Sequence, residues 1–421
     1  MTICPHDKCT GCYACANICP KHCITMGEDD YGELHPYVNE SECISCTLCV
    51  KTCPSNNPPE YKYPSKCHAA WITDKEKRCV CASGGLGTIL SEYVIRFKNG
   101  VVFGTAYDDN LIPVTTYTET LEGIEKFKGS KYVQGIVGDT TLKEMKGFLD
   151  KGRFVLYIGT PCQIAGAKKF LKKDYNNLIT VDLICHGVTP TSYFKEEIDY
   201  LVKQNNIKGL VDVRFRGNDS NNYCLSLWDK IKGKKKNFNF YLTLWKLVGG
   251  AKMLCYRKIH SEDYYLSSFL LGVSLRENCF SCQYARPERV SDLTIGDFIG
   301  LGRTTPFAYS TANVSSVTTN TTKGNSFYEE VLSHMSELMS VEREYSERLV
   351  YKPSLVVPFP RHPLNQKFRE LYPQYGFVRS IRLVLRRKII WNRVVRVLNN
   401  WTYVYRVPRK IVKLLLAKKK S

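Results

Sequence analysis

The sequence predicts an α/β protein, α+β over the whole chain, with a cysteine-rich first domain, a sheet-and-helix body and a basic helical tail. Three observations predict this arrangement. Cysteines repeat with a fixed spacing within the first 60 residues, and strand and helix patterns alternate from about Trp71 onward. Positions 378–421 hold 14 Lys and Arg residues and no acidic residue. The 421 residues are enough for about three domains.

Composition limits the kind of protein that this can be. Hydrophobic residues make up 43% of the chain and charged residues 24%, so we expect a buried core and no extensive disorder. No apolar run is long enough for a membrane-spanning helix, and the first residues lack the apolar stretch of a secretory signal. We therefore expect a cytoplasmic protein whose 19 cysteines stay reduced and bind metal rather than form disulfides.

Two short segments in the first domain, residues 1–60, repeat one cysteine spacing. The first runs from Cys9 to Pro20 and the second from Cys43 to Pro54, and both read C-x2-C-x2-C-x3-C-P. This is the run of two-cluster bacterial ferredoxins, in which three thiolates hold one cubane and the fourth reaches the other. A structural zinc site is the alternative, but zinc needs four ligands and not two complete runs. On the ferredoxin pattern one [4Fe–4S] cluster is held by Cys9, Cys12, Cys15 and Cys53, and the second by Cys43, Cys46, Cys49 and Cys19.

Two further cysteines of this domain, Cys4 and Cys23, fall outside the pattern. We expect them to behave as small buried hydrophobic residues. The prolines between residues 58 and 64 then indicate an extended linker out of the domain.

Strand and helix patterns alternate along the body, which we divide into residues 66–150 and 151–345. The strand patterns cover residues 101–106, 153–158 and 177–184, and the helix patterns cover residues 85–98 and 163–171. Such alternation predicts a mainly parallel sheet that binds its ligands at the carboxyl ends of its strands.

Four cysteines of the body form a candidate metal-ligand set. Cys162 and Cys185 each follow a predicted strand, and Cys279 and Cys282 form a C-x2-C pair. Together they are candidates for a third [4Fe–4S] cluster. Because isolated buried cysteines are common and one such pair is a weak signal, the spacing alone leaves a structural role open.

The glycine loop Ser83–Gly87 opens a predicted helix. Backbone N–H groups at such a position can bind a phosphate, and a packed turn is the alternative. The glycine spacing fits neither a Walker loop nor a dinucleotide-binding fingerprint.

Several of these segments recur in one order and spacing. They are Ala82–Gly85, Gly129–Gln134, Gly159–Gln163, Cys185–Gly187, Cys279–Cys282, Thr294–Asp297 and Asn320–Gly324. In this order they resemble the beta-subunit family of coenzyme F-420-reducing hydrogenase and reduced-F-420 dehydrogenase. The similarity covers residues 66 to 330, and an N-terminal two-cluster ferredoxin precedes it.

The resemblance implies a flavin-binding mixed sheet with flanking helices, in which FAD lies beside a cluster on the four cysteines of the body. It implies cofactor contacts at Ser83, Gly84, Gly85, Lys131, Tyr132, Gln134, Thr160, Gln163 and Asp297. His186 becomes a candidate proton donor and Lys131 a candidate stabiliser of reduced flavin, with a structural role in the pocket as the alternative for each. Cys79, Cys81 and Ile299 depart from the family's pattern and leave the substrate open.

We therefore expect an FAD- and [4Fe–4S]-dependent oxidoreductase that passes electrons between its clusters and FAD to reduce or oxidise an organic substrate or a deazaflavin-like coenzyme. An external one-electron carrier such as a ferredoxin is the expected partner. The alternatives are a non-catalytic iron–sulfur electron-transfer protein and a membrane-surface adaptor in polysaccharide biosynthesis. The direction of electron flow does not follow from the sequence, because the surroundings of each cluster set its potential.

The tail, residues 378–421, predicts a basic amphipathic helix. Its apolar face is expected to contain Ile381, Val384, Leu385, Trp391, Val394, Val395 and Leu398. A helix of this kind suits an anionic membrane surface, here the inner face of the membrane, and packing on the body is the alternative. No motif that reads nucleic acid accompanies the charge.

Overall fold

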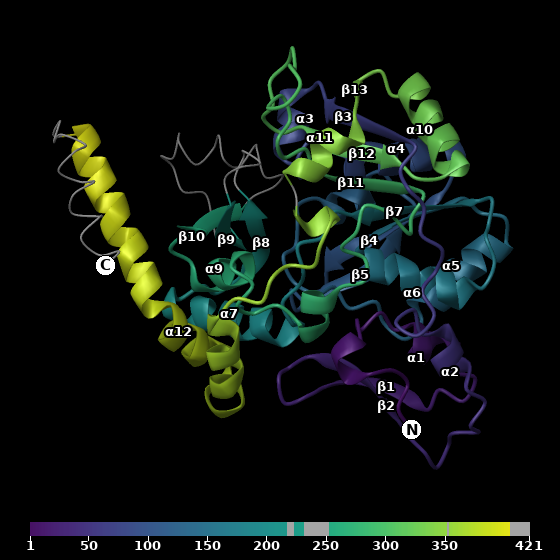
Figure 1. Ribbon diagram of the computed structural model, residues 1–421, viewed down its shortest axis with the longest axis horizontal. Coiled ribbons are helices and arrows are strands. Elements are labelled where there is room, and N and C mark those ends of the chain that lie inside the picture. The colour runs from purple at the N-terminus through teal and green to yellow at the C-terminus, as the bar shows by residue number, and fades with distance from the viewer. Residues whose placement is uncertain (217–222, 231–251, 352, 405–421) are drawn as a thin grey trace.

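The computed structural model describes residues 1–216, 223–230, 252–351 and 353–404 (Figure 1). Within these residues the body is built on an eight-stranded mixed sheet with strand order β13-β3-β12-β11-β7-β6-β4-β5. Neighbouring strands from β11 to β4 run parallel, and the flanking pairs are antiparallel. The predicted α/β fold with a mixed sheet is confirmed. The prediction that the sheet is mainly parallel is wrong, because four of its seven strand pairs are antiparallel. The strands in chain order are β3 (Lys66–Ile72), β4 (Val101–Tyr107), β5 (Pro113–Thr118), β6 (Val155–Gly159), β7 (Leu178–Leu183), β11 (Leu293–Asp297), β12 (Ser315–Thr319) and β13 (Leu338–Arg343).

Helices cover both faces of this sheet, because successive side chains of a strand point to opposite faces. Leu156 of β6 packs in one core with α4 (Leu86–Lys98) and α10 (Thr322–His334). Its neighbours Val155 and Tyr157 pack in another with α5 (Thr141–Asp150) and α6 (Pro161–Leu171). Strands buried on both faces are nearly continuous apolar runs, as the sequence of β6 shows.

The two predicted parts of the body form one sheet. Strand β3, from the first part, lies between β12 and β13 of the second. Two short helices follow strands of this group in the chain: α3 (Lys75–Cys79) follows β3, and α11 (Tyr345–Val350) follows β13.

The N-terminal domain lies beneath α6 in Figure 1. It consists of a β-hairpin and two short helices: α1 (Ala14–Ile18), β1 (Ile24–Glu28), β2 (Leu34–Val38) and α2 (Leu48–Thr52). Helix α6 approaches this domain through Gly166, where an added Cβ atom would lie 2.9 Å from both Cβ and Sγ of Cys12. Glycine is therefore required for the close contact between the two domains.

Arg276 joins the N-terminal domain to the body. Its side chain is fully buried, and its Nη2 donates to the carbonyl oxygens of Cys9 at 3.2 Å and Leu34 at 3.1 Å. Its Nη1 donates to Oε1 of Gln134 at 2.7 Å, and the amide nitrogen of Gln134 reaches the carbonyl oxygen of Thr10 at 3.4 Å. A buried guanidinium is tolerated only when its donors are paired, so this contact fixes how the two domains meet.

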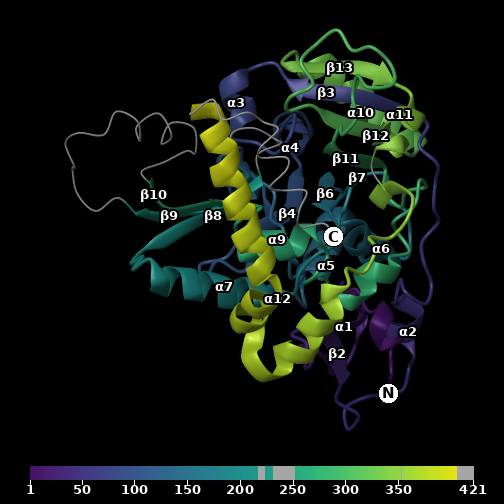
Figure 2. The same ribbon diagram turned by 60° about the vertical axis from the view of Figure 1, so that its left-hand side comes forward.

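A second, antiparallel sheet lies beside the body in Figures 1 and 2. It consists of β8 (Leu210–Arg216), β9 (Tyr223–Lys230) and β10 (Lys252–Ile259). Helices α7 (Thr191–Gln204) and α9 (Tyr264–Leu270) share a hydrophobic core with this sheet and with the C-terminal helix α12 (Leu364–Val404).

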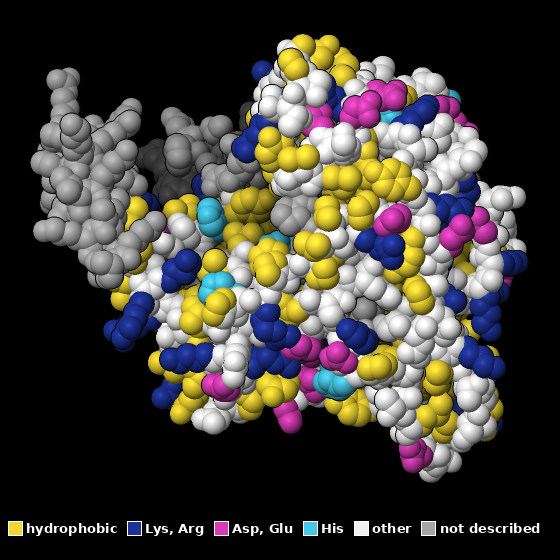
Figure 3. Space-filling view, in the orientation of Figure 1, with side chains coloured by type: hydrophobic (Ala, Val, Ile, Leu, Met, Phe, Trp, Pro, Cys, Tyr) yellow, Lys and Arg dark blue, Asp and Glu magenta, His cyan; other side chains and the backbone are white. Residues whose placement is uncertain are grey.

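The described part of the tail packs on the body. Helix α12 bends at Gly376, and Ile381 and Leu385 beyond the bend are fully buried, while Arg382 donates two 2.8 Å hydrogen bonds to Glu197 of α7. Val394, which was expected on the same apolar face, is 41% exposed, although Asn392 and Arg396 on either side of it still contact the body through Ser261 and Glu262. Basic and apolar side chains intermingle at the lower left of Figure 3, where α12 begins.

Residues 405–421, with the remaining predicted tail segment, lie outside the described residues. Among the residues that are described, no helix combines the length and apolar character needed to cross a membrane.

Replacing Gly166 with Ala tests the domain contact. The new methyl group meets Cys12 at 2.9 Å, so overpacking of about 1–3 kcal/mol outweighs the roughly 0.5–1 kcal/mol that alanine gains in a helix. We expect the urea midpoint of the anaerobic, iron-loaded protein to fall. Gly147→Ala in α5 is the matched control, since an added Cβ there meets no atom within 4 Å and should raise the midpoint. Equal shifts for both variants would contradict the contact.

Candidate functional site

The two predicted thiol sets of the N-terminal domain each surround a small hollow. The first set, Cys9, Cys12, Cys15 and Cys53, lines one hollow together with Cys4. The second set, Cys19, Cys43, Cys46 and Cys49, lines another together with Cys23. In each set three thiols come from one cysteine run and the fourth from the other run, as the spacing predicts. Four thiols around one hollow are the donors that a [4Fe–4S] cubane requires.

Cys4 and Cys23 lie beside these sets and do more than fill space. A hydrogen bond from Cys4 lowers the pKa of Cys53 to about 7 and is the largest cause that lowers the pKa of Cys9. The Sγ atoms of Cys23 and Cys19 are 3.5 Å apart. As expected of small hydrophobic residues, Cys23 is buried in the hydrophobic core and Cys4 is half-buried against it, and both also line the hollows of the thiol sets. Their spacing gave no signal, because they reach the thiol sets only through the folded hairpin and the N-terminal segment.

The structure also brings the third thiol set, Cys162, Cys185, Cys279 and Cys282, together at one end of the parallel strands. Burial raises the pKa of the Cys279 thiol well above its ordinary value, and the charges of Cys185, Cys282 and Cys162 raise it further. The thiol of Cys162 lies 3.2 Å from Thr160 Oγ1, and the backbone N–H of Gly187 donates to Cys185 Sγ at 3.3 Å. The donor set therefore fits a third cluster.

Helix α6 connects the first and third thiol sets. Cys162 lies in its first turn, and Gly166, which contacts Cys12, follows four residues later on the same face. One helical turn rises about 5.4 Å, so the two sets approach each other across this turn.

A cavity of about 310 Å³ opens at the carboxyl ends of the four parallel strands. Each strand contributes to its wall: Gly104 from β4, Gly159 from β6, Leu183 from β7 and Gly296 from β11. Cys185 of the third thiol set lines the same cavity. Its volume falls within the roughly 300–1,000 Å³ of ligand pockets, and its position is where the sequence placed a ligand site.

The glycine loop meets this cavity at the N-terminus of α4. Ser83 and Gly85 line it, and Gly85 caps the helix with a φ of 87°. Gly84 does not line the cavity. Its N–H donates to Ser315 Oγ at 2.9 Å, and an added Cβ would lie 2.3 Å from the carbonyl oxygen of Ala70. Gly84 therefore allows close packing of the loop, while the helix end next to it suits a phosphate.

Thr160 and Gln163 form the start of α6 and also line the cavity. Gln163 Oε1 accepts from the backbone N–H of Thr160 at 3.0 Å, and Gln163 Nε2 donates to the carbonyl oxygen of Gly135 at 3.1 Å. This capping network holds the turn that carries Cys162 against the cavity.

Lys131 lies in the cavity wall with its Nζ 5.3 Å from the ring centre of Tyr107. Burial lowers the pKa of Lys131 to about 7, and the charge of Arg214 lowers it while that of Asp212 raises it. The Lys131 amine therefore becomes protonated as the pH falls through about 7. Tyr132, the next residue, also lines the cavity and stacks on Phe269 with ring centres 4.9 Å apart.

His186 and Asp297 line the cavity as well. His186 Nε2 lies 3.3 Å from the carbonyl oxygen of Phe269. Asp297 accepts two hydrogen bonds from Arg216, at 2.9 and 2.6 Å, so its carboxylate is held in an ion pair at the cavity edge. Arg216 was not predicted, because it comes from the second sheet and no motif marks it.

Gln134 does not line the cavity, although its neighbours Lys131 and Tyr132 do. It lies on the other side of this segment, where it binds Arg276 and reaches Thr10. Its side chain therefore faces the N-terminal domain at Thr10 and Gly11 and not the cavity.

Two known protein families match parts of this chain. Residues 8–57 match the 4Fe-4S dicluster domain, and residues 152–343 match the family described as the C terminus of the coenzyme F420 hydrogenase/dehydrogenase beta subunit. The predicted resemblance to this beta-subunit family is confirmed over residues 152–343, and a dicluster ferredoxin domain precedes them. The chain is thus related to iron–sulfur electron-transfer proteins of this oxidoreductase family, and its N-terminal domain matches a domain that binds [4Fe–4S] clusters.

Individual relatives match mainly the N-terminal domain. It is 38% identical over 52 residues to NADH-quinone oxidoreductase subunit I 2 of Geobacter metallireducens, covering 11% of this chain and 40% of that protein. It is 35% identical over 54 residues to a ferredoxin of Methanocaldococcus jannaschii, covering 13% of this chain and 69% of that protein. In a comparison of structures, 81% of this chain is similar to 94% of a chain of the xenon-derivatised F420-reducing [NiFe] hydrogenase complex of Methanosarcina barkeri, with 17% identity and a TM-score of 0.38.

The lowered pKa of Lys131 can be measured directly. We expect one ¹³C-dimethylated lysine to titrate near pH 7, charged below it and neutral above it, while surface lysines titrate near their ordinary value of about 10.4. The NMR signal should vanish in Lys131→Met and remain in Lys195→Met, which removes an exposed lysine. A wild-type spectrum with no lysine titrating below pH 9 would contradict the desolvated position.

Proposed function

We propose that the chain is an iron–sulfur flavoprotein oxidoreductase that passes electrons between [4Fe–4S] clusters and FAD to reduce or oxidise an organic substrate or a deazaflavin-like coenzyme. The observation that carries the proposal is the shared wall: Cys185 belongs to the third thiol set and also lines the cavity. When bound, clusters exchange single electrons and a flavin exchanges a hydride equivalent, so a chain that holds both converts between these modes.

Several residues of the cavity suit a flavin dinucleotide. The N-terminus of α4 beside Ser83 and Gly85 offers backbone N–H groups to a phosphate, and Lys131 offers a cationic partner below about pH 7. Tyr132 and Phe269 present stacked rings at the wall. Within the proposal, Lys131 stabilises charge on a reduced cofactor and His186, held near the Phe269 carbonyl, exchanges a proton with the substrate.

The N-terminal domain supplies the entry for electrons in this proposal. Cys46 of the second thiol set is exposed, whereas Cys12 of the first set is buried against α6. An external one-electron carrier such as a ferredoxin is therefore expected to dock near Cys46.

Binding of the tail to an anionic membrane surface also stays a prediction. It is supported by Leu383, Ile390 and Val397, which are exposed along α12.

Iron analysis tests the third thiol set. Anaerobically purified protein should contain about 12 iron atoms per chain, as three cubanes require, and Cys162→Ser should contain about 8. Cys79→Ser, which removes a half-buried cysteine of α3 outside all three sets, should keep the wild-type iron content. If Cys162→Ser and wild type both hold about 8, the third cluster does not exist and a chain with two clusters remains.

Filling the cavity tests the flavin. Gly87 lines the cavity, and an added Cβ there meets no atom closer than 3.9 Å, so Gly87→Leu occupies the space without a backbone clash. We expect FAD affinity to fall at least about tenfold, or about 1.4 kcal/mol, with unchanged iron. Gly147→Leu, on α5 with open space around it, is the control.

The same experiment separates the alternative function. Wild-type protein that carries iron but binds no flavin by absorbance or by fluorescence after release would indicate a non-catalytic electron carrier. In that case Gly87→Leu and Gly147→Leu would not differ.

A further inference from the structure

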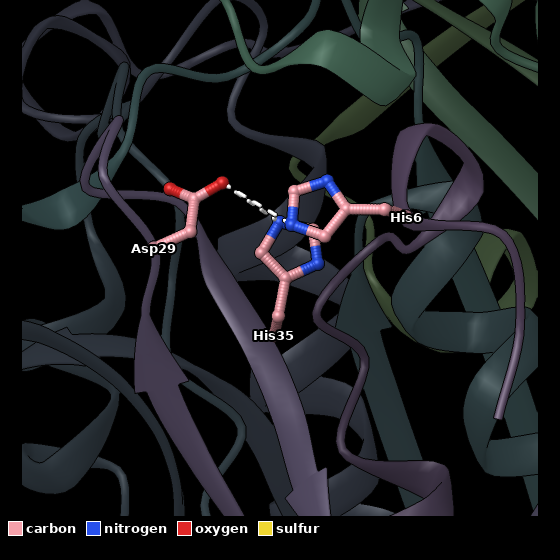
Figure 4. A group of neighbouring side chains, drawn as sticks. All are labelled: His6, Asp29 and His35. Carbon is pink, nitrogen blue, oxygen red and sulfur yellow. Dashed lines mark ion pairs between the residues drawn. The ribbon is translucent and has the colours of Figure 1, made fainter. Parts of the chain in front are cut away.

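Three side chains of the N-terminal domain converge outside the thiol sets (Figure 4). His6 begins the short 3₁₀ helix His6–Lys8, Asp29 directly follows β1, and His35 belongs to β2. Asp29 Oδ2 lies 3.3 Å from His6 Nε2 and 3.5 Å from His35 Nε2. We propose that His6, Asp29 and His35 bind a divalent first-row transition-metal ion.

The Asp29 carboxylate is fixed so that one oxygen faces the two histidines. Its Oδ1 accepts hydrogen bonds from the backbone N–H groups of Tyr31 at 2.9 Å and Glu33 at 2.8 Å. Its Oδ2 is buried and has no hydrogen-bond partner among the described residues, and the side chain is only 10% exposed. The turn therefore positions in the protein interior a carboxylate oxygen that has no hydrogen bond and faces the two histidines.

His35, which faces Asp29, also has a buried polar atom without a hydrogen bond. Its side chain is 6% exposed, and its Nε2 has no hydrogen-bond partner among the residues that the structure describes. A buried polar atom without a partner costs about 1–3 kcal/mol, and buried polar atoms are normally paired. A direct charged hydrogen bond to Asp29 would need about 2.7–2.9 Å, so the 3.5 Å separation is not explained by one.

The separations match a set of metal ligands. Bonds of about 2.0–2.1 Å in a tetrahedral site place neighbouring ligand atoms about 3.3–3.4 Å apart. The 3.5 Å between Asp29 Oδ2 and His35 Nε2, the two buried groups, agrees with this spacing. Two imidazoles and one carboxylate are donors of catalytic zinc sites and of non-haem iron sites, in which further positions stay open to water or substrate.

His6 is the adjustable ligand. Its side chain is 62% exposed, and its ring stacks on His35 with centres 3.6 Å apart and an interplanar angle of 12°. A metal ion lies near the plane of each imidazole that binds it, so the exposed His6 ring has to turn out of the stack while His35 stays in place. The open positions of the ion would then face solvent on the side of His6.

The proposed ion would lie close to the first thiol set. Cys9 of that set directly follows the short helix that begins with His6, and its backbone N–H donates to the His6 carbonyl oxygen at 3.2 Å. A bound cation would therefore add positive charge beside the first cluster. Because added positive charge favours the reduced state, the reduction potential of that cluster should rise when the ion binds.

Zinc titration of the full, cluster-loaded chain tests the site. The protein is purified anaerobically, freed of loosely bound metal, and titrated with Zn²⁺ in a calorimeter, with iron measured before and after. Zn²⁺ is the stringent probe, because an N/O site binds it more tightly than Fe²⁺. We expect one equivalent to bind without loss of iron, and the potential of one cluster to rise.

Two variants and one control locate the binding. His6→Ala removes an exposed ligand, and Asp29→Asn keeps the Oδ1 acceptor of the turn while it removes the charge at Oδ2. Each should weaken Zn²⁺ binding by at least about tenfold and abolish the rise in potential. His22→Asn, at an exposed histidine of the same domain, should leave both unchanged. Absence of zinc binding to the wild type, or unchanged affinity in both variants, would overturn the proposal.

Discussion

One buried cation pairs polar groups of both the N-terminal domain and the body where the two meet. Arg276 donates to the carbonyl oxygens of Cys9 and Leu34 from one domain and to Gln134 and Asn278 from the body. Removing a guanidinium from water is costly unless its donors are paired, and these partners come together only in one relative position of the domains. The arginine therefore specifies the register in which the first thiol set meets α6.

The relative position of the two domains determines how close the first thiol set comes to the third. Gly166 allows Cys12 to touch α6, and Cys162 lies one turn earlier on the same helix. The strand ends that position Cys162 and Cys185 also form the cavity wall, since β6 and β7 are parallel neighbours. A single parallel-sheet edge thus holds the thiols on one side and a ligand-sized space on the other, which suits an exchange of electrons between them.

The sequence predicted those features whose partners are close along the chain or are brought together by the sheet. Cysteine spacing identified both N-terminal sets, and strand ends identified Cys162, Cys185 and the cavity. Prediction from the sequence failed where contacts between distant parts of the chain determine the position of a side chain. Gln134 shares a motif with Lys131 but turns to the opposite side, toward Arg276. His6 and His35 meet only when the hairpin folds, so neither carried a signal in the linear sequence.

Within the proposed function, the first and third thiol sets hold clusters close enough to interact across one turn of α6. Electron paramagnetic resonance of the fully reduced chain tests this interaction directly. We expect spin–spin broadening or splitting in the wild type that exceeds what the two ferredoxin clusters alone produce, and its loss in Cys162→Ser. A wild-type spectrum that equals the sum of the Cys162→Ser spectrum and one isolated cluster signal would contradict the account.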